Sequence, residues 1–209
     1  MKSVFSILIL LLFSAFSMQA QNDSDKFDPF HNATFAIGGG IFMPQGKLAN
    51  YFGTAPFLEV SVNFPLRRKR AIGMNLQVVI PNQKDDFLYR RTIDTIQVKS
   101  TMMLNFTVDF KKSLYTSTKG NLELKLGLGV SAITTDARNP FYSGEEGEEK
   151  YETISSVLFS PGLEYQYEFS QNSKFVIGVS LNYAPYKVEG AVREDIGGLA
   201  FVPKIAFIF

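Results

Sequence analysis

The sequence lacks cysteine and tryptophan entirely, and histidine occurs once, as His31. Without cysteine the chain can form no disulfide, no thiolate nucleophile and no thiolate-ligated metal site. A general base that acts near neutral pH is most often a histidine, and the only one stands in a polar stretch near the N-terminus. We therefore expect a protein that is not an enzyme, with no catalytic residue, no metal site and no cofactor.

An excess of one charge is also missing. Lysine and arginine together number 21, and aspartate and glutamate number 20, which leaves a formal net charge of +1. Proteins that bind nucleic acid usually carry a basic surplus. The balance of charge gives no reason to propose nucleic acid as a partner.

Long apolar runs are absent beyond the N-terminus, because polar residues interrupt every later one. Residues 4–16 form one short apolar run, which follows Lys2 and precedes Ser-Met-Gln-Ala at residues 17–20. This run is shorter than the ~20 residues that a spanning helix needs, and its flanks are typical of a secretory signal. We predict a signal peptide over residues 1–20, with a retained membrane anchor as the alternative, and a polar periplasmic lead-in over residues 21–32.

Alternation of apolar and polar side chains is abundant instead, and it is clearest at the C-terminus. Within residues 199–209 every second side chain is large and apolar, while Lys204 lies on the opposite face. Successive side chains of a β-strand point to opposite faces of the sheet, so this period of two predicts a strand. A strand with one apolar and one polar face suits a barrel that faces lipid outside and a polar lumen inside.

The same alternation recurs along the chain and predicts eight strands. They cover about residues 33–43, 57–65, 71–80, 95–110, 121–132, 154–169, 174–185 and 199–209. Their lengths suit tilted strands that cross a bilayer, and bacterial barrels of one chain have an even number of strands. We predict an all-β fold over residues 33–209, an eight-stranded antiparallel up-and-down transmembrane β-barrel.

The connections between these strands predict the orientation of the barrel. Long and short connections alternate, except that residues 111–120 are longer than a minimal turn. Outer-membrane barrels place long loops outside and short turns in the periplasm, so both termini are expected in the periplasm of a bacterial cell.

The alternative is a soluble lipocalin-like barrel with its apolar faces inside. The two faces are too unequal for that alternative, because one is nearly all Leu, Ile, Val, Phe and Tyr. Glycine supports the membrane barrel independently, since a narrow interior has room for few side chains. The glycines on the predicted inner face are Gly38, Gly40, Gly73, Gly127, Gly129, Gly162 and Gly178.

Charged residues on the predicted inner face form a candidate polar network in the lumen. Charges in a tube of low dielectric must pair or change their ionisation, and Lys204 is placed to reach Glu164. The expected role is a structural plug of salt bridges, with acid–base chemistry or a proton path as the alternative. The predicted members are Glu59, Lys99, Asp109, Glu123, Lys125, Glu164, Glu168 and Lys204.

Two charged connections are candidate surface sites. The acidic stretch at residues 145–149 is expected to be a solvated outer loop, with binding of a divalent cation as the alternative. The basic turn at residues 67–70 is expected at the periplasmic membrane surface, where it meets lipid phosphates or simply water.

Three segments carry a resemblance to a known family: Ser-Met-Gln-Ala-Gln at residues 17–21, Gly-Gly-Gly-Ile-Phe-Met-Pro at residues 38–44 followed by Gly-Lys-Leu-Ala-Asn-Tyr-Phe at residues 46–52, and Phe-Ile-Phe at residues 207–209. With these features the chain resembles the small outer-membrane β-barrel proteins of Bacteroidetes-type bacteria, called porin-family or PorT-like. In plan it is also similar to the OmpA transmembrane domain and to OmpX-type proteins.

The resemblance implies a protein without enzymatic activity that is a structural or accessory subunit of an envelope complex, in protein secretion or assembly. It further implies contact with outer-membrane lipid and lipopolysaccharide, and recognition of Phe207 and Phe209 by the barrel-assembly machinery as a C-terminal signal. The alternative function is a porin-like barrel for small solutes or lipids. Such a barrel needs a gap between strands, and prolines, which interrupt ladder hydrogen bonds, mark the places to look: Pro161, Pro185 and Pro203.

Overall fold

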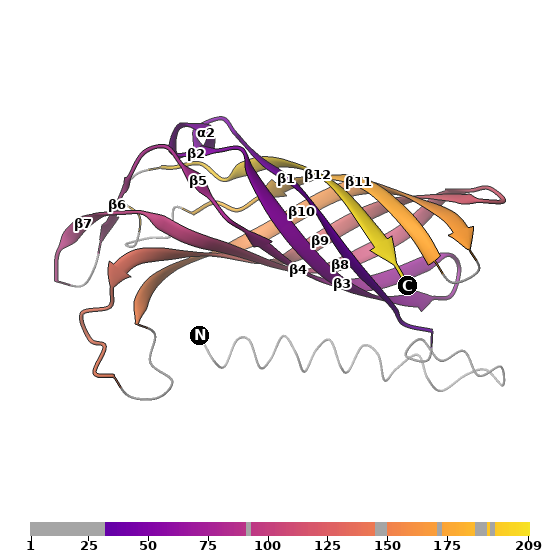
Figure 1. The fold of residues 1–209 in the computed structure, drawn as a ribbon, viewed down its shortest axis with the longest axis horizontal. Coiled ribbons are helices and arrows are strands. Elements are labelled where there is room, and N and C mark those ends of the chain that lie inside the picture. The colour runs from indigo at the N-terminus through magenta and orange to yellow at the C-terminus, as the bar shows by residue number, and fades with distance from the viewer. Residues whose placement is uncertain (1–31, 91–92, 145–149, 171–172, 187–191, 193–194) are drawn as a thin grey trace. The chain divides into compact units, whose positions relative to one another are not determined.

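The computed structural model describes residues 32–90, 93–144, 150–170, 173–186, 192 and 195–209, and these belong to the second of two compact units, Asn32–Phe209. The predicted signal peptide, nearly all of the lead-in, His31 and the acidic stretch at residues 145–149 lie outside the described residues. Within the described unit, eight long strands close into one barrel (Figure 1).

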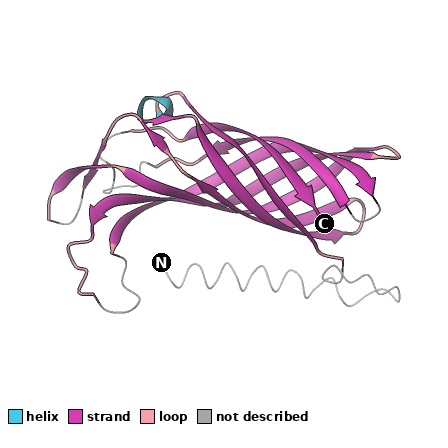
Figure 2. Ribbon diagram, viewed as in Figure 1, coloured by secondary structure: helices cyan, strands magenta, loops and turns pink. Residues whose placement is uncertain are grey.

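Every neighbouring pair of barrel strands is antiparallel, and the order around the barrel is β1-β12-β11-β10-β9-β8-β4-β3. Figure 2 shows how strands dominate the fold. The predicted eight-stranded antiparallel barrel is confirmed. The barrel strands are β1 (Thr34–Gln45), β3 (Ala55–Leu66), β4 (Arg70–Val79), β8 (Ser100–Thr116), β9 (Gly120–Arg138), β10 (Tyr151–Ser170), β11 (Ser173–Tyr183) and β12 (Leu199–Ile208).

The two ends of the barrel differ in their connections. The turn end carries the short connections between β3 and β4, β8 and β9, and β10 and β11, together with the start of β1 and the end of β12. The loop end carries the four long connections. They contain helix α2 (Leu48–Tyr51), the pair β2 (Phe52–Gly53) with β5 (Asn82–Gln83), and the hairpin β6 (Phe87–Arg90) with β7 (Thr95–Val98).

Two predicted boundaries are wrong, and both concern β8. The predicted long connection at residues 111–120 is a short turn, because β8 continues to Thr116 and β9 begins at Gly120. The predicted strand at residues 95–110 is two strands, β7 and β8, with an irregularity in register between Ser100 and Met102. An irregularity of this kind shifts the alternation by one residue, which a simple period of two does not anticipate.

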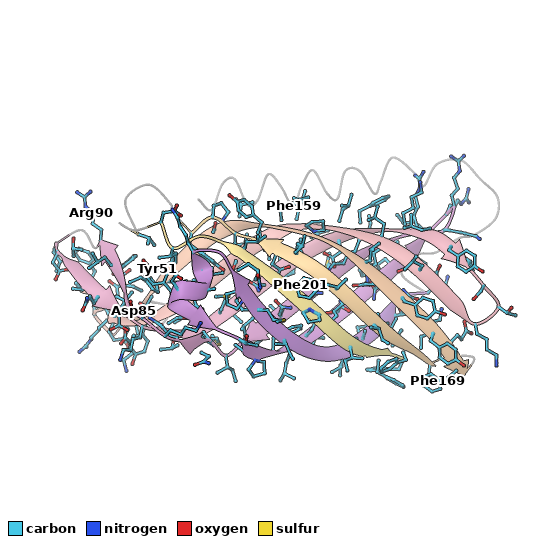
Figure 3. The ribbon with its side chains drawn as sticks, turned by 90° about the horizontal axis from the view of Figure 1, so that it is seen from above. Tyr51, Asp85, Arg90, Phe159, Phe169 and Phe201 are labelled. Atoms are coloured by element: carbon cyan, nitrogen blue, oxygen red, sulfur yellow. The ribbon has the colours of Figure 1, made fainter. Side chains whose placement is uncertain are left out.

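The apolar face of every barrel strand points outward. Leu58 is 71% exposed, whereas its neighbour Glu59 is 3% exposed. Phe159, Phe169 and Phe201 are exposed on the same wall (Figure 3). Soluble monomers rarely expose apolar patches larger than a few hundred Å², and here such a patch surrounds the barrel. The wall therefore faces hydrocarbon, and the soluble lipocalin-like alternative is wrong.

Aromatic side chains gather on the wall at the turn end. The ring centroids of Phe169 and Phe207 lie 5.7 Å apart, and those of Phe207 and Phe209 lie 6.1 Å apart. Girdles of aromatic residues at the edges of the apolar band are typical of barrels in membranes. Among the described residues, no helix has the length and apolar character needed to cross a membrane.

The interior is divided along the barrel axis. Toward the loop end it is filled by buried apolar side chains from the strands and the long loops, which we call the apolar plug. Its most completely buried large members are Leu48, Phe52, Phe87, Val79, Val98, Met103, Ile133, Ile154, Leu158, Ile196 and Val202. Toward the turn end the interior is mainly polar, apart from a small apolar cluster of Ala36, Val176, Ala206 and Ile208. The sequence predicted a polar filling throughout, and this holds only for the turn half.

Candidate functional site: the buried ion network

The register of four strands brings the central charges together. Glu164 on β10 lies opposite Gly178 on β11, and Gly178 lies opposite Lys204 on β12. Because side chains at paired positions point to the same face of a sheet, the carboxylate of Glu164 and the ammonium of Lys204 both enter the lumen and meet across the glycine. Their Oε1 and Nζ atoms are 2.8 Å apart.

Glu164 is the centre of the cluster. Its Oε2 accepts a hydrogen bond from Lys111 Nζ at 2.8 Å, and Lys125 Nζ approaches its Oε1 at 4.0 Å. The side chain of Glu164 is 2% exposed. One buried carboxylate thus shares three lysines, including Lys204, which compensates for the loss of its hydration.

Two further acids balance these lysines. Lys204 Nζ lies 2.5 Å from Glu59 Oε1, and Lys125 Nζ lies 3.6 Å from Asp109 Oδ2. The cluster, which we call the buried ion network, therefore holds three acids and three lysines and has no net charge. Its members are Glu59, Asp109, Glu164, Lys111, Lys125 and Lys204.

Glycines on the inner face leave the room that the network occupies. A Cβ atom at Gly178 would lie 3.1 Å from Glu164 Cγ and 3.2 Å from Lys204 Cε. A Cβ atom at Gly127 would lie 2.5 Å from Asp109 Oδ1. Two of the inward glycines that the sequence singled out, Gly178 and Gly127, are therefore positions where charged side chains lie against the barrel wall.

Neutral hydrogen bonds connect the network to the apolar plug. Asn105 Nδ2 donates to Gln77 Oε1 at 2.8 Å, and Ser131 Oγ donates to Asn105 Oδ1 at 2.5 Å. The hydroxyl of Tyr186, from the connection after β11, lies 2.6 Å from Ser131 Oγ and 3.6 Å from Met103 Sδ. Burial raises the pKa of Tyr186 from 10.0 to about 12, so the phenol remains neutral at physiological pH.

Three predicted members of the network lie outside its core. Lys99 is exposed, so its prediction is wrong: the irregular register after residue 100 turns its side chain away from the lumen, and its backbone N–H donates to Asp136 Oδ1. Glu168 is also exposed, 3.9 Å from Lys174 at the turn end. Glu123 is half-buried and accepts hydrogen bonds from Asn121 and Gln166 at 2.7 and 2.6 Å.

Lys111 is the member that sequence reasoning missed. It stands two positions after Asp109 and so lies on the same inner face, but the predicted strand ended at Phe110 and placed Lys111 in a loop. The signal was present, because the register of β8 and β9 continues unbroken past the predicted end. Extending the alternation by one more residue would have found it.

Every charged side chain of the network has an oppositely charged neighbour: each of its carboxylates is paired with at least one lysine, and each lysine with at least one carboxylate. Within the described ranges, no group of three or more His, Asp or Glu side chains is arranged to hold a metal ion. Because a buried charge that loses its partner is very costly, the arrangement holds β3, β8, β9, β10 and β12 in one relative position.

A cavity of about 390 Å³ opens at the turn end, on the outer side of the network. We call it the turn-end cavity. Lys111, Glu123, Gln166 and Glu168 line it, together with residues of the two short turns. The lumen is thus polar and open to solvent at one end, and apolar and closed at the other.

Comparisons with known proteins bear on the fold. No protein-family model and no curated protein matches the sequence. Among solved structures, Neisserial surface protein A (NspA) has a TM-score of 0.57 at 10% sequence identity, over 84% of this chain and 94% of that chain.

Two other structures align less well, and no conclusion rests on them. The N-terminal β-barrel domain of Pseudomonas aeruginosa OprF has a TM-score of 0.46 at 12% identity, over 85% of this chain and 98% of that one. A major outer membrane protein from Thermus thermophilus has a TM-score of 0.46 at 12% identity, over 86% and 99%. The chain therefore shares the small-barrel fold of NspA, as the OmpA-like and OmpX-like plan predicted.

Proposed function

We propose that this chain is a non-enzymatic integral β-barrel of the bacterial outer membrane that acts as a structural or accessory subunit of an envelope complex, in protein secretion or assembly. The observation that carries the proposal is the filled interior. Ile133, Ile154 and Leu158 are each at most 1% exposed in the apolar plug, and the paired charges of the network lie behind them. A barrel of eight strands has space for such a filling but hardly for a pore as well.

Because the interior is filled, we expect the protein to contact its partners through its outer surfaces. β9 and β10 are the longest strands, and they pair with each other as far as Arg138 and Tyr151, whereas β10 pairs with β11 only from Phe159 onward. The loop end also exposes Ile93 and Phe141, which are 64% and 67% exposed. An extended hairpin with exposed apolar side chains is a suitable contact for a larger membrane protein.

The proposed orientation places the turn end and both termini in the periplasm and the long loops outside, in accordance with the usual plan of such barrels. Outer-membrane lipid and lipopolysaccharide are the proposed partners of the apolar wall. Phe207 and Phe209 are 41% and 55% exposed on this wall, where the barrel-assembly machinery could read them as a C-terminal signal. A tag fused near residue 32 should be cleaved by a protease supplied to the periplasm. Cleavage by a protease added outside intact cells would show that the barrel has the opposite orientation.

Crosslinking in native membranes tests the accessory role. A photoreactive residue at Phe141 should capture a larger envelope protein, and purification in mild detergent should recover the same protein. The control is the same residue at Leu128, which is 62% exposed on the lipid-facing wall of β9. Recovery of the chain solely as a lone monomer, with no adduct at Phe141, would contradict the proposal.

The second candidate is a porin-like barrel for small solutes or lipids, favoured by the turn-end cavity and by the prolines. The ladder between β10 and β11 lacks the pair at Pro161, and the ladder between β1 and β12 lacks the pair at Pro203, but in both ladders the pairing resumes in the same register. Pro185 lies beyond the end of β11. Planar-bilayer recordings distinguish the candidates: discrete conductance steps would support the porin-like function, and a silent protein supports the accessory one.

A further inference from the structure

We propose that the turn-end cavity is a binding site for a phosphate group, carried either by a soluble phosphate ester or by a lipid headgroup. This inference goes beyond the accessory role and does not depend on it. The cavity holds about 390 Å³, which is within the usual range of small-molecule sites. Residues from all eight barrel strands and from two turns line it, so a rigid scaffold surrounds whatever binds there.

The lining has a clear excess of positive charge. Five basic residues line it against two acidic ones, Glu123 and Glu168, and one of the five, Arg70, stands at an outward position of β4 opposite Leu66. Two of the basic residues are already engaged, since Lys111 is bonded to Glu164 and Lys174 lies 3.9 Å from Glu168. In the part of the chain that the structure describes, no acidic side chain pairs with the other three, which are Lys69, Arg70 and Lys119.

Hydrogen-bonding groups complement these cations. Hydroxyl groups of the β8–β9 turn region surround the cavity, and Lys69 Nζ lies 3.4 Å from one of them, Thr116 Oγ1. Asn63 lines the cavity too, and its Oδ1 atom is buried without a partner among the described residues. A buried polar atom without a partner is costly, and a hydroxyl of a bound phosphate ester, such as those of glycerol 3-phosphate, would satisfy it.

Phosphate fits this environment better than a carboxylate. Two cations without an acidic partner among the described residues, Lys69 and Lys119, exceed the single charge of a carboxylate, whereas a phosphate monoester carries up to two charges and three acceptor oxygens. Arginine and lysine next to hydroxyl donors are the usual ligands of phosphate in proteins. The cation excess therefore points to a doubly charged group.

The basic turn supplies an independent observation. Arg68 and Lys69 have φ angles of 61° and 55°, in the left-handed region that glycine occupies at little cost. A non-glycine residue there costs roughly 1 kcal/mol or more. The chain nevertheless carries Lys69 at this position, which places its ammonium at the cavity. Lys69→Gly therefore removes the charge while relieving the backbone.

Calorimetric titration of the full chain in maltoside detergent tests the site, with glycerol 3-phosphate and inorganic phosphate as probes. Both should bind saturably, and Lys69→Gly and Lys119→Gln should each weaken binding about tenfold, the effect of losing one charge-assisted hydrogen bond. The matched control is Lys99→Gln, which removes an exposed lysine far from the cavity lining. The control should bind as the unchanged protein does.

The source of the phosphate is decided in lipid nanodiscs. If the site takes a lipid headgroup, replacing part of the phosphatidylcholine by phosphatidic acid, whose phosphate is a monoester like that of glycerol 3-phosphate, should compete with glycerol 3-phosphate in the unchanged protein but not in Lys69→Gly. If the site takes a soluble ester, the lipid composition should leave the titration unchanged. Absence of saturable binding with both probes in detergent and in nanodiscs, or an equal loss in Lys99→Gln, would overturn the proposal. A retained melting temperature in Lys69→Gly keeps a loss of binding from being mistaken for unfolding.

Discussion

The two halves of the barrel interior are built on opposite principles. In the turn half, Glu164 and its lysines are held by directed pairs of charges, and every member depends on its partner. In the loop half, Met103 and Ile133 are held by close packing, without charges. The interior of one narrow barrel is therefore filled in two different ways. Pairs of charges fix relative positions and tolerate little change, whereas packed apolar side chains lose stability in proportion to the volume removed.

The largest expected effect is on the charged half. Glu164→Gln leaves three lysines opposite only Glu59 and Asp109, so the free energy of unfolding should fall by about 3–5 kcal/mol. Urea unfolding in detergent, followed by the shift of the folded band on electrophoresis, measures it. The control, Glu168→Gln, breaks an exposed pair and should cost less than about 1 kcal/mol. Equal effects of the two substitutions would show that the network is not the stabilising centre.

The next effect concerns the apolar half. Ile154→Ala should lower the free energy of unfolding by about 3 kcal/mol, because Ile154 is 1% exposed and its removal leaves a cavity in the plug. Val157→Ala, on the same strand but 70% exposed toward lipid, is the matched control and should change little. If both substitutions cost the same, the plug is not closely packed, and the contrast between the two halves is lost.

A smaller effect is expected where the wall meets the network. Gly178→Ala introduces a Cβ atom 3.1 Å from Glu164 Cγ, and the flexible side chains must shift to accommodate it. We expect a loss of about 1–3 kcal/mol, typical of an added methyl group in a packed interior. The double variant with Glu164→Gln should lose less than the sum of the single losses, since the two positions share one contact. Additive losses of the free energy of unfolding would show that Gly178 and Glu164 do not interact.

The smallest effect concerns the boundary between the halves. Tyr186→Phe removes the bond to Ser131 and should cost about 1 kcal/mol near neutral pH. The raised pKa also predicts a pH dependence: the stabilisation by neutral Tyr186 is complete below pH 10.0 and is lost as the pH rises toward about 12. In Tyr186→Phe, the free energy of unfolding measured across that pH window should no longer show this decrease. If the variant keeps the same pH profile, the hydroxyl of Tyr186 is exposed to water and is not buried.

Much of the charged half was predictable from the sequence. Alternation placed Glu59, Asp109 and Glu164 on the inner face, because a barrel wall has only two faces and lipid excludes charges from one of them. The same rule failed for Lys99, where the irregular register after residue 100 reverses the faces over a short stretch. It also failed for Lys111, because a strand continues beyond the lipid, where apolar side chains no longer mark its outer face.

The apolar half was not predictable in the same way. Val98 alternates like a lipid-facing residue but is 1% exposed, and Phe52 and Phe87 come from connections where no period exists. The plug combines residues from the barrel strands with residues from three of the long connections, so no single segment indicates which of its side chains will be covered.

By itself the sequence determined the class of fold, the number of strands and which residues meet lipid, because these follow from local alternation repeated along the chain. Only the tertiary structure decided which charges meet, where the lumen closes and where a cavity remains. Those features depend on the register between strands far apart in the chain, and on loops that pack over one end of the barrel. The physical reason is that a side chain's direction is a local property of the backbone, whereas its partner is set by closure of the whole barrel.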